Sequence, residues 1–284
     1  MKRTLKELTI KDNFMFGAVM SKPENCQRFL ELILHITIEN VEVNLEHSIV
    51  YHPEYKGIRL DVYAKDENKT HYNVEMQAIR ENAIGKRARY YHSQIDMELL
   101  LSGEEYEKLP NTYVIFICDF DPFLKEKYCY TFDNRCLEDK DLSMQDGVKS
   151  IFLSTRGKNR NEVSKELVNF LDYVKADLEE STKDFQDDFV RQLQSSVQSI
   201  KLSRKMEEKF MILHEMLRDE RAEGKAEGKA EGKAEAILDL LQDLGKISDD
   251  LKEKIISEQD TVLLLKWLKL AAKSETIQQF EKSM

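Results

Sequence analysis

The sequence has 284 residues, a formal net charge of −10, 41% hydrophobic residues and 34% charged residues. This length favours one compact domain with an appendage over two equal halves. The longest apolar runs, such as residues 114–118, are too short to span a bilayer, and the N-terminal residues lack the apolar core of a signal peptide. We therefore expect a cytoplasmic protein with no membrane partner. The negative charge argues against indiscriminate coating of nucleic acids, but it does not decide what a local surface binds.

Cysteine, histidine and glycine spacings exclude several kinds of site. The four cysteines form no C-x-x-C pair and have no companion histidines at zinc-ligand spacing, so we expect reduced thiols. The histidines are isolated and no G-x-S-x-G segment occurs, which argues against a Ser/His hydrolase. The AEGK repeat at residues 222–236 lacks the spacing of a phosphate loop, and we expect no organic cofactor.

The chain opens with helical patterns at residues 9–16 and 25–35, the second of them behind Pro23. Alternating apolar and polar side chains then predict three consecutive strands, at residues 41–51, 57–65 and 70–77. Apolar side chains recur every three or four positions in residues 82–101, which predicts an amphipathic helix. An unbroken apolar run between Pro110 and Pro122 predicts a strand buried on both faces. Two more strands and a helix are expected at residues 127–132, 149–154 and 161–178. This order predicts a mixed α/β core.

Charged helical sequence without proline follows from residue 177. The four-residue repeat puts no strongly apolar quadrant on a helix, and each glycine costs about 1 kcal/mol relative to alanine, so we expect a marginal helix or a flexible hinge there. Three short amphipathic helices end the chain, and the last carries an apolar face formed by Leu263, Leu264, Trp267 and Leu268. We expect an α/β domain in residues 1–180, a charged helix and repeat linker in 181–235, and a small helical tail in 236–284.

Two carboxylates in the second and third predicted strands stand out. The period of two puts Asp61 on one face of its strand and Glu75, with Gln77, on one face of the next. With a turn of three or five residues, Asp61 lies directly opposite Glu75, with Cβ atoms about 5 Å apart. Facing carboxylates repel each other unless a cation lies between them, and hard divalent cations prefer carboxylate oxygens. The spacing is equally compatible with one of the two side chains facing solvent.

The motifs around this pair resemble those of the recombination-promoting nuclease (Rpn) and putative transposase family within the PD-(D/E)XK nucleases. Asp61 within I-R-L-D-V-Y precedes Glu75 within Y-N-V-E-M-Q by fourteen residues. The R-A-R-Y-Y-H-S-Q-I-D helix, the G-E-E-Y-E-K-L-P turn, the V-I-F-I-C-D-F-D-P-F strand and the opening K-D-N-F-M-F are also similar to that family. The resemblance covers residues 5–180.

The resemblance implies a restriction-endonuclease-like α/β core and a Mg²⁺-dependent DNA endonuclease associated with recombination or mobile elements. Asp61 and Glu75 would be metal ligands, Asp12 would be the additional acidic ligand, and Gln77 would stand where other members have a catalytic lysine. Glutamine carries no positive charge to stabilise a pentavalent phosphate, although its amide can orient a water molecule.

Basic and polar side chains near the motif are candidates for DNA binding. On the predicted helix these are Arg87, Arg89, Tyr90 and Gln94, and after a later strand they are Arg156 and Lys158. Arg87, Tyr90 or Tyr91, and Gln94 follow one another at spacings of three or four residues, and we expect Arg87, Tyr90 and Gln94 to lie off the apolar stripe that includes Tyr91. The alternative for the helix is an ordinary solvated face. Few basic clusters predict weak, salt-sensitive binding of DNA.

Two functions follow from these observations. The first is an active metal-dependent DNA endonuclease. The second is a weakly active or inactive nuclease-fold protein that binds DNA as an accessory factor. In both cases the apolar face of the helical tail should be unshielded in the tail alone, so it should pair with a second copy or fold back on the front domain. Of these we expect self-association, a homo-oligomer and most simply a dimer.

Overall fold

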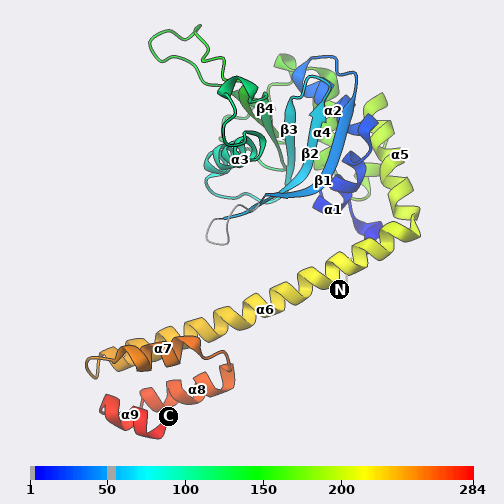
Figure 1. Ribbon diagram of the computed structural model, residues 1–284. Coiled ribbons are helices and arrows are strands. Elements are labelled where there is room, and N and C mark those ends of the chain that lie inside the picture. The colour runs from blue at the N-terminus through cyan, green and yellow to red at the C-terminus, as the bar shows by residue number, and fades with distance from the viewer. Residues whose placement is uncertain (1–3, 50–55) are drawn as a thin grey trace. The chain divides into compact units, whose positions relative to one another are not determined.

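The computed structural model describes residues 4–49 and 56–284, which form two compact units, Met1–Glu207 and Glu208–Met284 (Figure 1). We call them the front unit and the tail unit. The first strand expected from the sequence ran to residue 51, and its last two residues lie outside the described part of the chain. Among the described residues, no helix is both long and apolar enough to cross a membrane.

Within the described residues, the front unit contains a six-stranded sheet with the order β1-β2-β3-β4-β6-β5. Its outer pairs β1–β2, β2–β3 and β5–β6 are antiparallel, and its central pairs β3–β4 and β4–β6 are parallel. The central strand β4 is buried because helices cover both faces of the sheet, and its sequence TYVIFIC is accordingly almost continuously apolar. The strands are β1 Val41–Ile49, β2 Ile58–Asp66, β3 His71–Gln77, β4 Thr112–Cys118, β5 Cys129–Phe132 and β6 Val148–Ser154.

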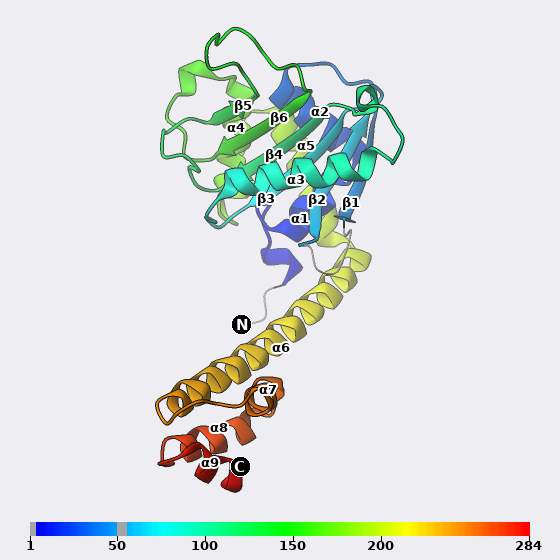
Figure 2. The same cartoon turned by 60° about the vertical axis from the view of Figure 1, so that its left-hand side comes forward.

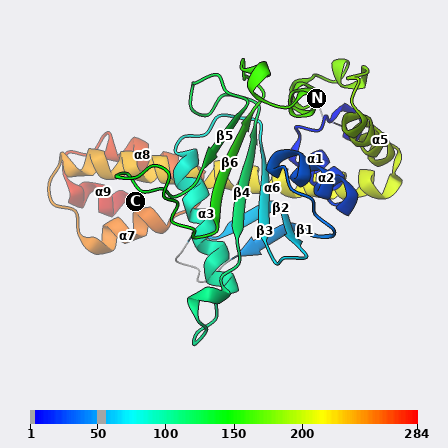
Figure 3. The same ribbon diagram turned by 90° about the horizontal axis from the view of Figure 1, so that it is seen from above.

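One helix covers one face of the sheet and a group of helices covers the other. Figure 2 shows α3 (Ile84–Leu99) crossing in front of the strands. Figure 3 shows α1 (Asn13–Met20), α2 (Pro23–Leu34) and α5 (Asp188–Leu202) on the opposite side. Helix α4 (Lys165–Lys175) packs against α2 and α5. Short 3-10 turns lie at Leu5–Glu7, Tyr106–Lys108, Arg160–Glu162 and Glu180–Thr182.

The local sequence explains where several helices begin and end. Pro23 occupies the first turn of α2, where its missing N–H costs nothing, and His35 ends that helix in a left-handed conformation with φ 56°. The side-chain oxygen of Ser164 accepts a hydrogen bond from the Leu167 N–H and so caps α4. The expected restriction-endonuclease-like mixed sheet with flanking helices and a helical C-terminal region is confirmed.

The front unit extends beyond the boundary near residue 180 that the sequence suggested. Helix α5 packs on α1, α2 and α4, and its apolar side chains, including Phe189 and Leu193, are buried. Asn25, which is fully buried in α2, donates a hydrogen bond of 3.1 Å to Ser196 and accepts one of 2.8 Å from Gln192. Because α5 closes the core beneath α1 and α2, the compact unit ends after it.

The tail unit is built on α6 (Arg204–Gln242), which runs without a break through the AEGK repeat. The repeat places an alanine every four residues, and Ala230 and Ala234 are buried at 2% and 4% exposure. The repeat pattern alone predicted no packing role for this quadrant. Small side chains on one face allow neighbouring helices to approach closely, so the alanines form a contact surface instead.

The apolar face of the tail is covered within the tail unit. Helices α7 (Asp249–Ser257), α8 (Thr261–Ala271) and α9 (Ile277–Ser283) gather against the last turns of α6 (Figure 1). Leu264 and Trp267 belong to the resulting core, and Leu263 and Leu268 are partly buried against it. The expectation of an unshielded Leu/Trp face is therefore wrong, because the short helices pack on the alanine side of α6.

Candidate functional site

Asp61 and Glu75 meet where the ladder between β2 and β3 ends. The antiparallel register pairs Val62 with Val74, so Asp61 and Glu75 are the next residues on the two strands. At this position, hydrogen bonds from main-chain N–H groups to the two carboxylates replace the main-chain hydrogen bonds of the ladder. The Asp61 N–H donates to Glu75 Oε1 at 3.2 Å, and the Met76 N–H donates to Asp61 Oδ2 at 3.2 Å. The two carboxylates thus lie together, each held by the main chain of the opposite strand.

Glu75 is an unusually placed carboxyl group. Its side chain is almost entirely buried, and this burial raises its pKa to about 7. This value is a net result: burial is the largest cause, the nearby charge of Asp61 also raises the pKa, and Arg87 lowers it. Perturbed carboxyl groups of this kind cluster at functional sites. A cation beside Glu75 and Asp61 would relieve both the desolvation and the repulsion.

Asn73 lies two residues before Glu75 in β3 and is fully buried. Neither polar atom of its amide makes a hydrogen bond of normal geometry, although the amide lowers the pKa of Glu75. Most buried amides are satisfied, so an unsatisfied one beside a charged site is notable. Sequence reasoning assigned Asn73 no role, although it belongs to the same alternating series as Glu75.

Arg87 of α3 connects the two motif residues of β3. Its Nη2 donates to Glu75 Oε2 at 2.8 Å, and its Nη1 donates to Gln77 Oε1 at 2.8 Å. A further bond of 3.0 Å joins Nη1 to Glu81, and Nε donates to the Tyr91 hydroxyl at 2.7 Å. The guanidinium is therefore fixed by side chains from β3, from the following loop and from its own helix.

The same guanidinium rests on aromatic rings. Its Cζ lies 5.1 Å from the centre of the Tyr91 ring and 5.5 Å from that of Phe116. Such contacts stabilise a cation and fix its plane. The helical periodicity placed Tyr91 on the apolar stripe of the helix. The spacing of three or four residues left open whether Tyr90 or Tyr91 meets Arg87, and the structure brings Tyr91 to it.

The remaining α3 candidates divide between surface and interior. Arg89 is exposed, as a residue that contacts DNA must be. The Tyr90 hydroxyl donates to the carbonyl oxygen of Lys56 at 2.5 Å, which ties α3 to the start of β2. Gln94 is only 8% exposed, so the expectation that it lies off the buried stripe is wrong. Its position on the helix turns it toward the sheet.

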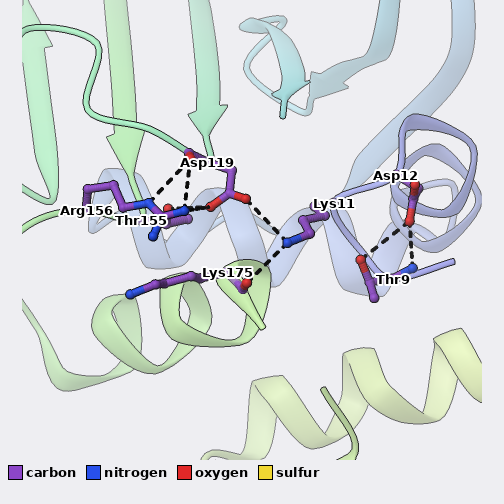
Figure 4. Close-up of polar contacts among 7 residues, drawn as sticks. All are labelled: Thr9, Lys11, Asp12, Asp119, Thr155, Arg156 and Lys175. Atoms are coloured by element: carbon purple, nitrogen blue, oxygen red, sulfur yellow. Dashed lines mark hydrogen bonds and ion pairs between the residues drawn. The ribbon is translucent and has the colours of Figure 1, made fainter. Parts of the chain in front are cut away.

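Arg156 and Lys158 follow β6 and line a pocket of about 710 Å³ beside α4. Both are already paired with acidic side chains. Arg156 lies 3.2 Å from Asp119, and Lys158 lies 2.5 Å from Glu126. The pocket is also lined by Asp121, Leu124, Tyr128, Thr155, Gly157, Arg160, Asp172 and Lys175. Figure 4 shows Arg156, Thr155 and Asp119 together at the strand ends.

Asp12 has a structural position at the start of α1. Its Oδ2 accepts hydrogen bonds from the N–H and hydroxyl of Thr9, at 2.7 and 3.4 Å, and Figure 4 shows this pair apart from the Asp119 group. Among the described residues, no three His, Cys, Asp or Glu side chains form a group that could hold a metal. Asp12 therefore does not join Asp61 and Glu75, and the expectation of a third acidic ligand there is wrong. Asp12 stands at the N-cap position of α1, but its carboxylate bonds Thr9 in the preceding turn and not the first N–H groups of the helix.

The fold and the carboxylate pair define the class of this protein, an α/β protein of the PD-(D/E)XK nuclease type. The model of the family described as "PD-(D/E)XK nuclease family transposase" matches residues 11–227, and the chain belongs to that family. Comparison with curated proteins and with solved structures found no match. The expected family resemblance is confirmed.

Proposed function

We propose that this protein is a metal-dependent DNA endonuclease that hydrolyses phosphodiester bonds, in the context of recombination or mobile elements. The observation that carries the proposal is the meeting of Asp61 and Glu75 at the open end of the β2–β3 ladder. Because the chain belongs to a nuclease family, we interpret this pair of carboxylates as a metal-binding site for phosphodiester hydrolysis.

The donor set at this end of the sheet fits a hard divalent cation. Mg²⁺ keeps several of its water molecules and is usually bound by only one or two protein carboxylates, so two carboxylates are a sufficient set. Asp61 and Glu75 would hold the ion, and burial of Glu75 beside a like charge favours binding of a cation there. A bound Mg²⁺ would activate water and offset charge on the phosphate oxygens.

Other residues of the front unit would bring DNA to this pair. Arg89 is exposed on α3, the helix that also carries Arg87. Arg156 and Lys158 lie at the ends of the neighbouring parallel strands, where their ion pairs with acidic side chains would have to open to meet phosphate. Such exchange predicts DNA binding that weakens steeply with salt.

The proposal predicts that D61A abolishes nicking. Purified full-length protein is incubated with supercoiled plasmid, with and without Mg²⁺, and nicked product is quantified over time. Loss of one of the two carboxylates that would hold the ion should reduce the rate at least about 100-fold, because activation of water and stabilisation of charge would be weakened together. The fold should remain, since Asp61 contributes charge rather than core volume.

The matched control is D139A, which removes an exposed aspartate from the loop between β5 and β6. It should nick plasmid like the wild type. Activity that survives in D61A would belong to a contaminant or to another site.

A second function is favoured by one observation. Both ends of the Gln77 amide are engaged within the protein, with Oε1 on Arg87 and Nε2 on the carbonyl oxygen of Ile79. If the motif residue is committed to structure, the chain could be a nuclease-fold accessory protein that binds DNA with little or no cleavage. Wild-type protein that shifts a DNA duplex in a gel but leaves plasmid intact with Mg²⁺ would favour this function.

A further inference from the structure

Arg87 is a cation in direct contact with both motif residues of β3, the charged Glu75 and the neutral Gln77. Hydrolysis of a phosphodiester forms a bond between a water oxygen and phosphorus and breaks one bond from phosphorus to a sugar oxygen. One proton of the water is lost and the leaving oxygen gains one. Between these events extra negative charge gathers on the phosphate oxygens, and a positioned cation lowers the barrier. Gln77 cannot provide that charge.

We propose that Arg87 supplies the positive charge that a lysine at position 77 would otherwise supply, and that Gln77 is a positioning residue for Arg87. This inference rests on the proposed endonuclease function. The geometry that carries it is the pair of 2.8 Å bonds from one guanidinium to Glu75 and to Gln77. The guanidinium of Arg87, which belongs to α3, thus places its positive charge beside Gln77 of β3.

Accessibility separates the two residues. The Arg87 side chain is 30% exposed, whereas Gln77 is 8% exposed. The arginine can meet a phosphate approaching from solvent. Gln77 is turned inward, and its amide holds Arg87 on one side and the carbonyl oxygen of Ile79 on the other.

Arg87 does not depend on Glu75 for its position. Gln77, Glu81 and Tyr91 hold Nη1 and Nε, and the rings of Tyr91 and Phe116 support the guanidinium plane. The remaining bond, from Nη2 to Glu75, is the one that a divalent cation on Glu75 would compete with. Nη2 is then the group left to donate to a phosphate oxygen.

The same arrangement explains why a neutral residue occupies position 77. A lysine there would put an ammonium group beside Nη1 of Arg87, where Gln77 Oε1 now accepts a hydrogen bond. Two cations at that separation repel each other, especially in a partly buried site. One positive charge can be accommodated, either on the strand or on the helix.

The test relocates this charge and measures plasmid nicking by the full-length protein at saturating DNA. R87A should lower kcat about 100- to 1,000-fold, the range for loss of one donor that stabilises charge in a transition state. Q77K should also be impaired, because its lysine opposes Arg87. Q77K/R87A should recover at least about tenfold of the R87A loss, because it restores one cation to the site. K86A, which removes an exposed charge one position away on α3, is the matched control and should retain kcat.

A second readout does not depend on turnover. Titration calorimetry with Mn²⁺ in the absence of DNA should give R87A the same or tighter metal affinity than the wild type, because Arg87 competes for Glu75. Weaker binding in R87A would mean that Arg87 merely supports the carboxylates, and would overturn the inference. The inference also fails if R87A retains kcat, or if Q77K/R87A recovers nothing. Wild-type protein without Mg²⁺-dependent nicking would instead overturn the proposed function, and this inference with it.

Discussion

Burying Glu75 beside Asp61 links the stability of the front unit to pH. The pKa of Glu75 is raised from 4.5 to about 7, so between these values the folded protein binds a proton that the unfolded chain has released. The free energy of unfolding therefore falls as pH rises through this window. The full shift corresponds to a loss of about 3 kcal/mol from this one group.

This linkage predicts that E75Q removes part of the pH dependence. Urea unfolding of metal-free protein, followed by far-UV circular dichroism, is measured between pH 4.5 and 7.5. The difference in unfolding free energy between E75Q and the wild type should shift in favour of E75Q by about 3 kcal/mol across the range. E107Q, which changes an exposed glutamate, should follow the wild type. Parallel curves for E75Q and the wild type would show that Glu75 titrates normally.

The sequence predicts the residue pair better than it predicts the surroundings of the pair. Alternation along two strands and the spacing between them are local, so they allowed Asp61 and Glu75 to meet, although they left equally open that one of the two faces solvent. The bonds of Arg87 to Glu75 and Gln77 depend on how α3 lies across the sheet, which no local pattern specifies. Asp12 was assigned from family resemblance alone, and the hydrogen bonds it accepts from Thr9 hold its carboxylate in the turn before α1.

At the scale of elements, strands and helices in the front unit follow from periodicity because each has one buried face. The boundary near residue 180 was misplaced for a different reason. Charged residues on the outer face of α5 concealed its buried face, and only the packing on α1, α2 and α4 shows that it belongs to the front unit. The AEGK repeat was similarly ambiguous, since its alanine quadrant becomes a contact surface only when α7–α9 are present.

The repeat gives a prediction about α6. Added Cβ atoms at Gly228 and Gly232 would meet no heavy atom within 4 Å, and both residues lie inside the helix. G228A and G232A should each stabilise the tail unit by about 1 kcal/mol, because alanine is the better helix former. Trp267 is the only tryptophan in the chain and lies in the tail core, so its fluorescence in urea reports on this unit.

A glycine outside the helix supplies the contrast. Gly245 follows α6 with φ +141°, a backbone conformation that alanine adopts only with strain. G245A should therefore lower the urea midpoint of Trp267 fluorescence, whereas G228A and G232A raise it. A fall in the midpoint for all three variants would mean that the repeat glycines are needed for a bend or a close contact.

At the scale of the whole molecule, each unit has a hydrophobic core of its own. The front core contains residues of the sheet and α3, and the tail core contains α6–α9 with Leu264 and Trp267 inside it. Self-association through the Leu263–Leu268 face would require this core to open. The sequence suggested the opposite because each of the short helices, considered alone, has more apolar surface than it can bury.

We therefore expect removal of residues 208–284 to leave the oligomeric state of the front unit unchanged. All residues of the candidate site, from Asp61 to Lys158, lie in the front unit, so the fragment 1–207 should also show the proposed Mg²⁺-dependent nicking. Light scattering of the fragment and of the full chain at equal molar concentration measures the number of copies, and circular dichroism establishes that the fragment is folded. A full chain with twice the copy number of the fragment would assign self-association to the tail. The tail would then self-associate through a surface other than its buried Leu/Trp face. W267A, which should lower the free energy of unfolding of the tail unit by about 3 to 5 kcal/mol, would abolish such a dimer only by unfolding the tail.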